Sequence, residues 1–153
     1  MFQHILVPID LSDRNEHAVR TAFELAASGT ARVTVLHVIT RVIGIPLAEM
    51  KTFYEQLEGK AHTRLAATIR RHAQPGMDAR AVVLLGDPPR DVVRWADRHR
   101  VDLIVIGSHS VEPRLHEPRL GWGTTSYKVA LLCRCPVLLV KAPPPRTGRR
   151  GRT

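Results

Sequence analysis

The fold is decided by VDLIVIGSHS, residues 101–110, and by GWGTTSYKVALLCRCPVLLVK, residues 121–141. These segments contain two apolar runs, Leu103–Ile106 and Val137–Val140, which are too short for helices and rich in Val, Ile and Leu. Runs of this kind are typical of strands buried on both faces of a parallel sheet. The last third of the chain therefore predicts two parallel strands joined by a loop and a helix.

The same alternation extends back to the N-terminus. Strands are expected at residues 3–9, 32–39, 80–85, 102–106 and 136–141. Between them, apolar residues at helical spacing predict four helices: one capped by Ser12 and closed by Ser28-Gly29, one from Leu47 to Ile69, one entered through Asp87 and Pro88, and one at about 124–134. Strands that alternate with helices predict an α/β fold, a single-domain, doubly wound, Rossmann-like parallel sheet of five strands with helices on both faces.

Length and charge bound the class of protein. The 153 residues suit one domain, expected over residues 1–142. The net charge of +9 arises partly from four arginines in PPPRTGRRGRT, residues 143–153, where three prolines oppose regular structure. This basic, disordered tail would make at most weak, unspecific contact with nucleic acid. No apolar run reaches the length of a membrane span, and the first residues do not resemble a signal peptide, so a cytoplasmic location is expected.

Several common chemistries have no motif in this chain. It contains no G-x-x-x-x-G-K-[ST], no G-x-G-x-x-G after the first strand and no G-x-S-x-G. Cys133 and Cys135 are too close in sequence for an easy disulfide and do not match zinc-ligand spacing, so packing is favoured over a redox or metal role. Of the eight histidines, His37 is expected inside a strand, and only His109 and His116 are expected near the candidate site.

Three small features could together hold an anionic ligand. Asp10 ends the first strand, where doubly wound sheets bind ligands, and its carboxylate could accept hydrogen bonds from ribose hydroxyls or form a turn. Gly107 follows the fourth strand and could let a phosphate approach the backbone, or serve a tight turn. Gly123-Thr124-Thr125 opens a helix and could be an anion-binding nest or an ordinary cap.

Taken in order, the motifs resemble those of the universal stress protein family over residues 2–141. The matching segments are ILVPIDLSD, TVLHVI, GDPP, VDLIVIGSHS and GTTSYKVALLCRCPVLLVK. The resemblance implies a strand order 3-2-1-4-5 and a homodimer built through the fifth strand. In the ATP-binding branch of the family, adenine and ribose lie at positions that here are Pro8, Ile9, Asp10 and Val38.

The resemblance also implies a phosphate-binding loop with the pattern G-x2-G-x9-G-[ST]. Gly107 matches its first glycine, and Gly123 with Thr124 matches its final pair, which Thr125 follows. Ser110 stands where the second glycine is expected, and twelve residues separate it from Gly123 instead of nine. The side chain of Ser110 and the added residues could obstruct a β-phosphate.

Two functions remain open. The first is a stress-response sensing module that binds ATP or AMP, with Mg²⁺, at the switch point between the first and fourth strands. The alternative is a nucleotide-free stress protein that works through dimerisation and an unidentified protein partner. No general base or set of metal ligands is evident, so catalytic residues are not assigned and at most slow ATP hydrolysis is expected. Other doubly wound proteins, such as flavin-binding or receiver-like domains, match the motifs less well.

Overall fold

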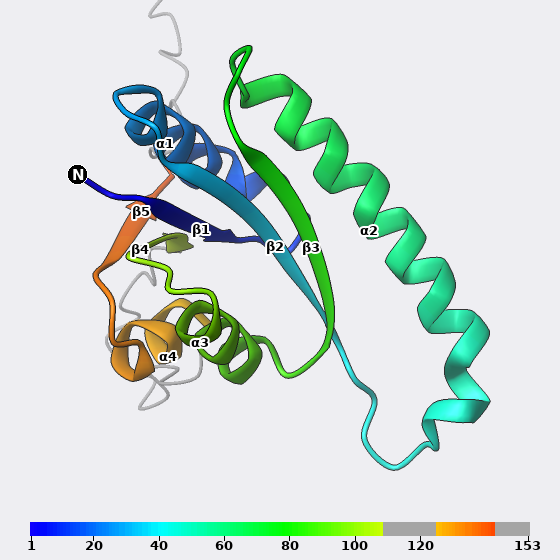
Figure 1. Cartoon of the computed structure of the whole chain (residues 1–153). Helices are drawn as coiled ribbons and strands as arrows, with labels where there is room; N and C mark the ends of the chain where they lie inside the picture. The colour runs from blue at the N-terminus through cyan, green and yellow to red at the C-terminus, as the bar shows by residue number, and fades with distance from the viewer. Residues whose placement is uncertain (109–124, 143–153) are drawn as a thin grey trace, which may run out of the picture.

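A five-stranded parallel sheet forms the centre of the molecule (Figure 1). The computed structural model describes residues 1–108 and 125–142. Within these ranges the strands are β1 (His4–Pro8), β2 (Arg32–Thr40), β3 (Ala79–Gly86), β4 (Leu103–Ser108) and β5 (Val137–Lys141). The α-helices are α1 (Glu16–Ala27), α2 (Lys51–His72), α3 (Pro88–Arg98) and α4 (Thr125–Leu132), and short 3₁₀ helices, η1 (Asp13–Asn15) and η2 (Leu47–Met50), precede α1 and α2.

The strand order is β3-β2-β1-β4-β5, and every neighbouring pair is parallel. This confirms the predicted fold class and strand order. The chain moves outward from β1 through β2 to β3, then crosses to β4 and continues outward to β5. Connections on the two sides of β1 and β4 therefore leave the sheet in opposite directions, and this switch point is where open α/β sheets form a crevice.

Alternate residues of the central strands pack into two separate hydrophobic cores, one on each face of the sheet. Ile5 and Val7 of β1 pack with α1 and α2, whereas Leu6 packs with α3 and α4 on the opposite face. β4 repeats the pattern, since Val105 joins the first core and Ile104 the second. The expected burial of Leu103–Ile106 on both faces is confirmed, and the alternation explains why the run is apolar throughout.

The corresponding expectation for Val137–Val140 is wrong. β5 pairs with β4 only, and Leu138 and Leu139 keep 39% and 43% of their surface exposed. Strand five lies at the edge of the sheet, so its apolar residues do not gain the double cover that β1 and β4 receive. In α4, Leu131 and Leu132 are exposed as well. Exposed leucines therefore occur both on β5 and at the end of α4.

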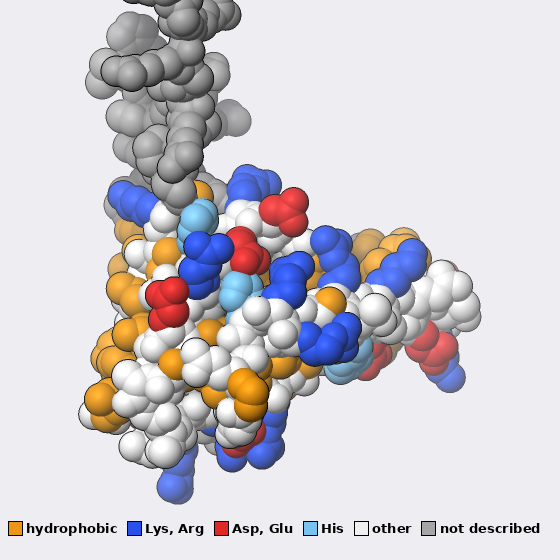
Figure 2. Space-filling model, turned by 90° about the horizontal axis from the view of Figure 1, so that it is seen from above, with side chains coloured by type: hydrophobic (Ala, Val, Ile, Leu, Met, Phe, Trp, Pro, Cys, Tyr) orange, Lys and Arg blue, Asp and Glu red, His pale blue; other side chains and the backbone are white. Residues whose placement is uncertain are grey.

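Helix α2 extends beyond the sheet as an arm (Figures 1 and 2). It begins at Lys51, after η2, so the helix predicted from Leu47 starts as a 3₁₀ turn. Its last turns are anchored by Leu65, which is fully buried, while residues of the first turns such as Phe53 are half exposed. Figure 2 shows Lys and Arg side chains spread along this arm, with acidic residues among them.

The two cysteines are both reduced and partly buried. Their Sγ atoms lie 3.3 Å apart, and both pack against the second core. Burial, followed by the hydrogen bond with Cys133, raises the pKa of Cys135 to about 12. A thiol with so high a pKa is a poor nucleophile at neutral pH, which agrees with the packing role expected from the sequence.

Two predictions about the C-terminal end of the chain concern residues outside the described ranges. The basic tail, residues 143–153, is one of them, so the domain boundary at residue 142 stays a prediction. No helix in residues 1–108 or 125–142 is long and apolar enough to cross a membrane.

The turn from β3 into α3 depends on a close approach at Gly86. A Cβ atom built there would lie 2.0 Å from Oδ2 of Asp91, which accepts a 2.7 Å hydrogen bond from the backbone N–H of Asp87. Asp87 in turn caps α3 by accepting a hydrogen bond from the backbone N–H of Arg90, as predicted. Gly86 thus leaves space for the carboxylate that fixes the start of α3.

We expect Gly86→Ala to lower the free energy of unfolding by about 1 kcal/mol, because the Asp91 carboxylate must move and lose its hydrogen bond. The matched control is Gly59→Ala in the middle of α2, where an added Cβ meets nothing within 4 Å. That substitution should raise stability by roughly 0.5–1 kcal/mol through helix propensity. Urea unfolding of both variants measures the difference, and a shift of the same sign in both would contradict the role given to Gly86.

Candidate functional site

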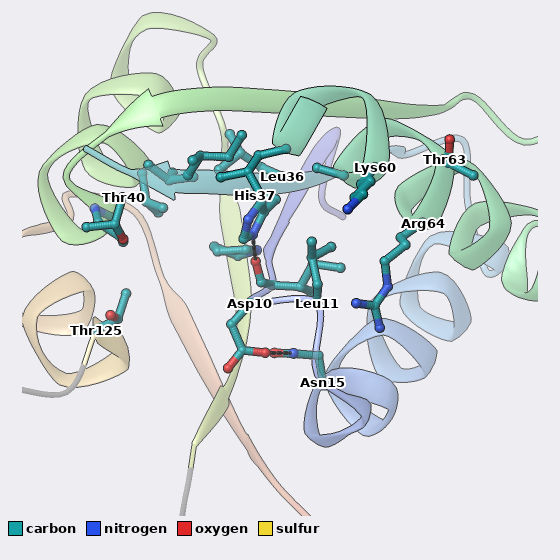
Figure 3. A pocket seen from close by; sticks show the side chains of 18 of the residues that line it. Asp10, Leu11, Asn15, Leu36, His37, Thr40, Lys60, Thr63, Arg64 and Thr125 are labelled. Atoms are coloured by element: carbon teal, nitrogen blue, oxygen red, sulfur yellow. Dashed lines mark hydrogen bonds between the residues drawn. The ribbon is translucent and has the colours of Figure 1, made fainter. Parts of the chain in front are cut away.

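A large cavity opens where β1, β2 and β4 end (Figure 3). Its volume is about 1340 Å³. Six of the nine residues predicted to bind a nucleotide line it: Pro8, Ile9, Asp10, Val38, Gly107 and Thr125. The other three, Ser110, Gly123 and Thr124, lie outside the described residues. The structure therefore brings together the described part of the predicted site.

The segment after β1 is a tight turn organised by Asp10. One oxygen of its carboxylate, Oδ1, accepts a 2.9 Å hydrogen bond from the backbone N–H of Ser12 and a short one from the side-chain amide of Asn15. The amide of Asn15 also donates to the carbonyl oxygen of Ser12 at 3.0 Å. Ser12 was expected to cap α1, but its side chain makes no capping bond; Asp10 and Asn15 hold the turn instead.

This arrangement leaves the carboxylate of Asp10 ionised. Partial burial raises the pKa of Asp10, but hydrogen bonds from Ser12 and Asn15 and the charge of Arg14 outweigh it, so the pKa lies below its ordinary value of 3.8. The hydrogen bonds from the backbone of Ser12 and from Asn15 both go to Oδ1. The turn-forming and ligand-binding interpretations of Asp10 are compatible, since a ligand would use the other oxygen.

Leu11 adopts a backbone conformation that is unusual for its residue type. Its φ is 67°, in the left-handed region that favours glycine. Such a conformation costs of order 1 kcal/mol and persists where the surroundings fix it. Here the hydrogen bonds of Asp10 on one side and the packing of Leu11 against the first core on the other supply that constraint.

The end of β2 is tied to the end of β1 by His37. The ring Nδ1 of His37 donates a 2.8 Å hydrogen bond to the carbonyl oxygen of Ile9, a tautomer assigned from the acceptor. His37 is part of the cavity wall (Figure 3). The prediction that His37 lies inside a strand is confirmed. The prediction that only His109 and His116 lie near the site is wrong, because His37 lines the cavity.

The β4 side of the cavity is formed by Gly107 and Thr125. β4 continues through Ser108, so Gly107 lies within the strand and not in a turn after it, and its φ is not positive. The turn interpretation of Gly107 is therefore wrong. A Cβ atom at Gly107 would sit 3.6 Å from Oδ1 of Asn15, so the backbone of β4 passes directly beside the Asp10 turn.

The opposite wall comes from α2, which the sequence analysis did not include. Lys60, Thr63 and Arg64 line the cavity, and Figure 3 shows Lys60 and Arg64 pointing toward it. Their spacing of three and four residues puts them on one face of the helix. The three- and four-residue spacing is present in the sequence, but only the tertiary packing shows that this polar face of α2 faces the carboxyl ends of the strands.

The described lining of the cavity combines apolar and polar groups. Apolar walls, a carboxylate, a histidine and two cations suit a flat, polar ligand with anionic groups. Among the described residues, no group of three or more His, Cys, Asp and Glu side chains is placed to hold a metal ion.

Comparison with known proteins agrees with this geometry. The family model described as "Universal stress protein family" matches residues 1–141. The protein YxiE of Bacillus subtilis, named a universal stress protein, is 29% identical, with 92% of this chain and all of YxiE covered.

Two solved structures with bound nucleotides are also similar to this chain. A universal stress protein in complex with cAMP is 25% identical with a TM-score of 0.69, and the match covers 91% of this chain and 97% of that one. The universal stress protein of Archaeoglobus fulgidus in complex with dAMP is 25% identical with a TM-score of 0.60, covering 92% and 98%. The sequence match, the strand order and these neighbours agree, and the chain belongs to the universal stress protein family.

Proposed function

We propose that this chain binds an adenine nucleotide in the cavity between the ends of β1 and β4 and acts as a sensing module in a stress response. The observation that carries the proposal is the convergence of Asp10, Val38, Gly107 and Thr125 on one cavity at the switch point of the sheet. Similar proteins bound to cAMP and dAMP support the adenine nucleotide as the ligand class.

In this proposal each side of the cavity has a separate task. Pro8, Ile9 and Val38 give apolar cover for the base, and Oδ2 of Asp10 accepts a hydrogen bond from a ribose hydroxyl. Gly107 and Thr125, with Ser110, Gly123 and Thr124, would receive the phosphates, either the monophosphate of AMP or the triphosphate of ATP with Mg²⁺. Binding would then bias the dimer or a partner surface, with no catalytic step. A cytoplasmic location stays a prediction from the sequence.

The ribose contact can be tested by comparing AMP with its 2′-deoxy and 3′-deoxy forms in titration calorimetry. We expect at least one deoxy form to bind about tenfold more weakly, because a hydrogen bond to a charged acceptor is lost. In Asp10→Ala this difference should disappear. Because the pKa of Asp10 lies below 3.8, the carboxylate stays ionised and the difference should be the same at pH 5.0 and pH 7.5.

Asp13→Ala is the matched control, since Asp13 is an exposed acid three residues away that does not line this cavity. It should keep the difference between AMP and the deoxy forms. Absence of binding by AMP and by ATP with Mg²⁺ at millimolar concentration, together with no nucleotide released from the denatured purified protein, would overturn the proposed function. Equal binding of all three monophosphates would overturn only the role of Asp10.

A homodimer through strand five is the second part of the proposal. Within the described residues, β5 has a hydrogen-bonded neighbour on one side only and exposes Leu138 and Leu139, and Leu131 and Leu132 of α4 are exposed as well. An apolar edge of this kind suits pairing with a second copy. The same surface would also serve the alternative function, a nucleotide-free protein that acts by dimerisation and partner binding.

We expect Leu139→Lys to weaken self-association at least tenfold in sedimentation velocity, because the substitution places a charge in the apolar contact. Leu25→Lys, at a similarly exposed leucine on α1, should leave the sedimentation coefficient unchanged. A wild-type protein that sediments as a monomer, or a Leu139→Lys dimer as stable as wild type, would contradict the strand-five interface.

A further inference from the structure

The cavity extends from the ends of the strands to α2. Its volume of about 1340 Å³ exceeds the roughly 300–1,000 Å³ of ordinary small-molecule sites. It also reaches both faces of the sheet, because Val38 belongs to the core beneath α3 and α4 whereas His37, the preceding residue in the strand, faces the side of α1 and α2. Space on the α1 and α2 side remains for a further group of the ligand.

That side carries two cations. Lys60 and Arg64 are one helical turn apart on α2, so they share a face, and both line the cavity. Figure 3 shows them on the side opposite Thr125, with Asp10 and His37 between. The proposed phosphate end and this cationic end are therefore separated by the proposed nucleoside position.

The charges of Lys60 and Arg64 are not neutralised by the described residues. No ion pair joins either side chain to an acid in these ranges, whereas Lys51 and Arg71 of the same helix pair with Glu55 and Glu16.

Two acids also line the cavity, and within the described residues neither forms an ion pair with Lys60 or Arg64. Oδ1 of Asp10 is taken by Ser12 and Asn15, and Glu55 lies 3.8 Å from Lys51. A ligand anion is the partner that the pair lacks, and phosphate suits it, because a guanidinium binds phosphate through two parallel hydrogen bonds and an ammonium adds a point charge.

We propose that Lys60 and Arg64 form a second anion subsite that takes a phosphate group carried outside the 5′ chain of the bound adenine nucleotide. The inference rests on the proposed function and narrows its ligand to a nucleotide with two separate phosphates. The second phosphate has two sources, a 3′-phosphate on the same ribose or the linking phosphate of a dinucleotide, and both present the same chemistry to α2.

Calorimetry with three probes separates these cases: AMP, adenosine 3′,5′-bisphosphate and the 5′-phosphorylated 3′,5′-linked diadenylate. We expect adenosine 3′,5′-bisphosphate or the phosphorylated diadenylate, or both, to bind about tenfold or more tightly than AMP. The probe that binds more tightly identifies the source of the second phosphate. In the double variant Lys60→Gln, Arg64→Gln the advantage over AMP should vanish while the affinity for AMP changes by less than about twofold. Raising the salt concentration should reduce the advantage in the wild type.

The matched control is Arg70→Gln, Arg98→Gln, which removes the same net charge at exposed positions that do not line the cavity. Loss of the advantage in this control as in the Lys60 and Arg64 variant would show a general effect of charge and overturn the subsite. Equal affinity of wild type for all three probes would overturn the subsite and leave the proposed function intact. Absence of binding by all three probes and by ATP with Mg²⁺ would contradict both the subsite and the proposed function.

Discussion

The site depends on the hydrogen bonds that Asp10 accepts from Ser12 and Asn15. They fix the chain where β1 ends and hold Leu11 at a φ of 67°. Asn15 also lies beside Gly107 of β4, so the Asp10 turn and β4 are close neighbours at the switch point. The carboxylate of Asp10 consequently has a fixed position between the end of β1 and the end of β4, and the rest of the cavity is arranged around it.

The sheet itself divides the cavity into two sides. Residues that alternate along β2 face different helical layers, so His37 and Val38, although adjacent, line one cavity from opposite sides of the sheet. The His37 ring is tied to Ile9, which couples the end of β2 to the Asp10 turn. A ligand that contacts both layers therefore meets Thr125 at one end and the cations of α2 at the other.

The sequence was sufficient for the fold class, because it depends on local apolar runs that alternate with helical patterns, and the resemblance to the family supplied the strand order. Six of the predicted site positions line one cavity, and their role in binding stays a prediction. Sequence-based prediction was wrong where the burial of a side chain depends on the position of its strand in the sheet. Leu138 and Leu139 have the composition of a buried strand, and only the edge position of β5 exposes them. Likewise, the spacing of Lys60 and Arg64 marks a helix face without showing what that face meets. Ser12 has a capping sequence, but Asp10 and Asn15 compete for the same turn.

The most direct test of the Asp10 turn as the centre of the site is an NMR titration of ¹⁵N-labelled protein with AMP. The account predicts that the largest amide shifts fall at the ends of β1 and β2, over residues 9–12 and 37–40, and that they are lost in Asn15→Ala, which removes the amide that positions Asp10. Shifts that are confined to other regions, or unchanged shifts in Asn15→Ala, would contradict it.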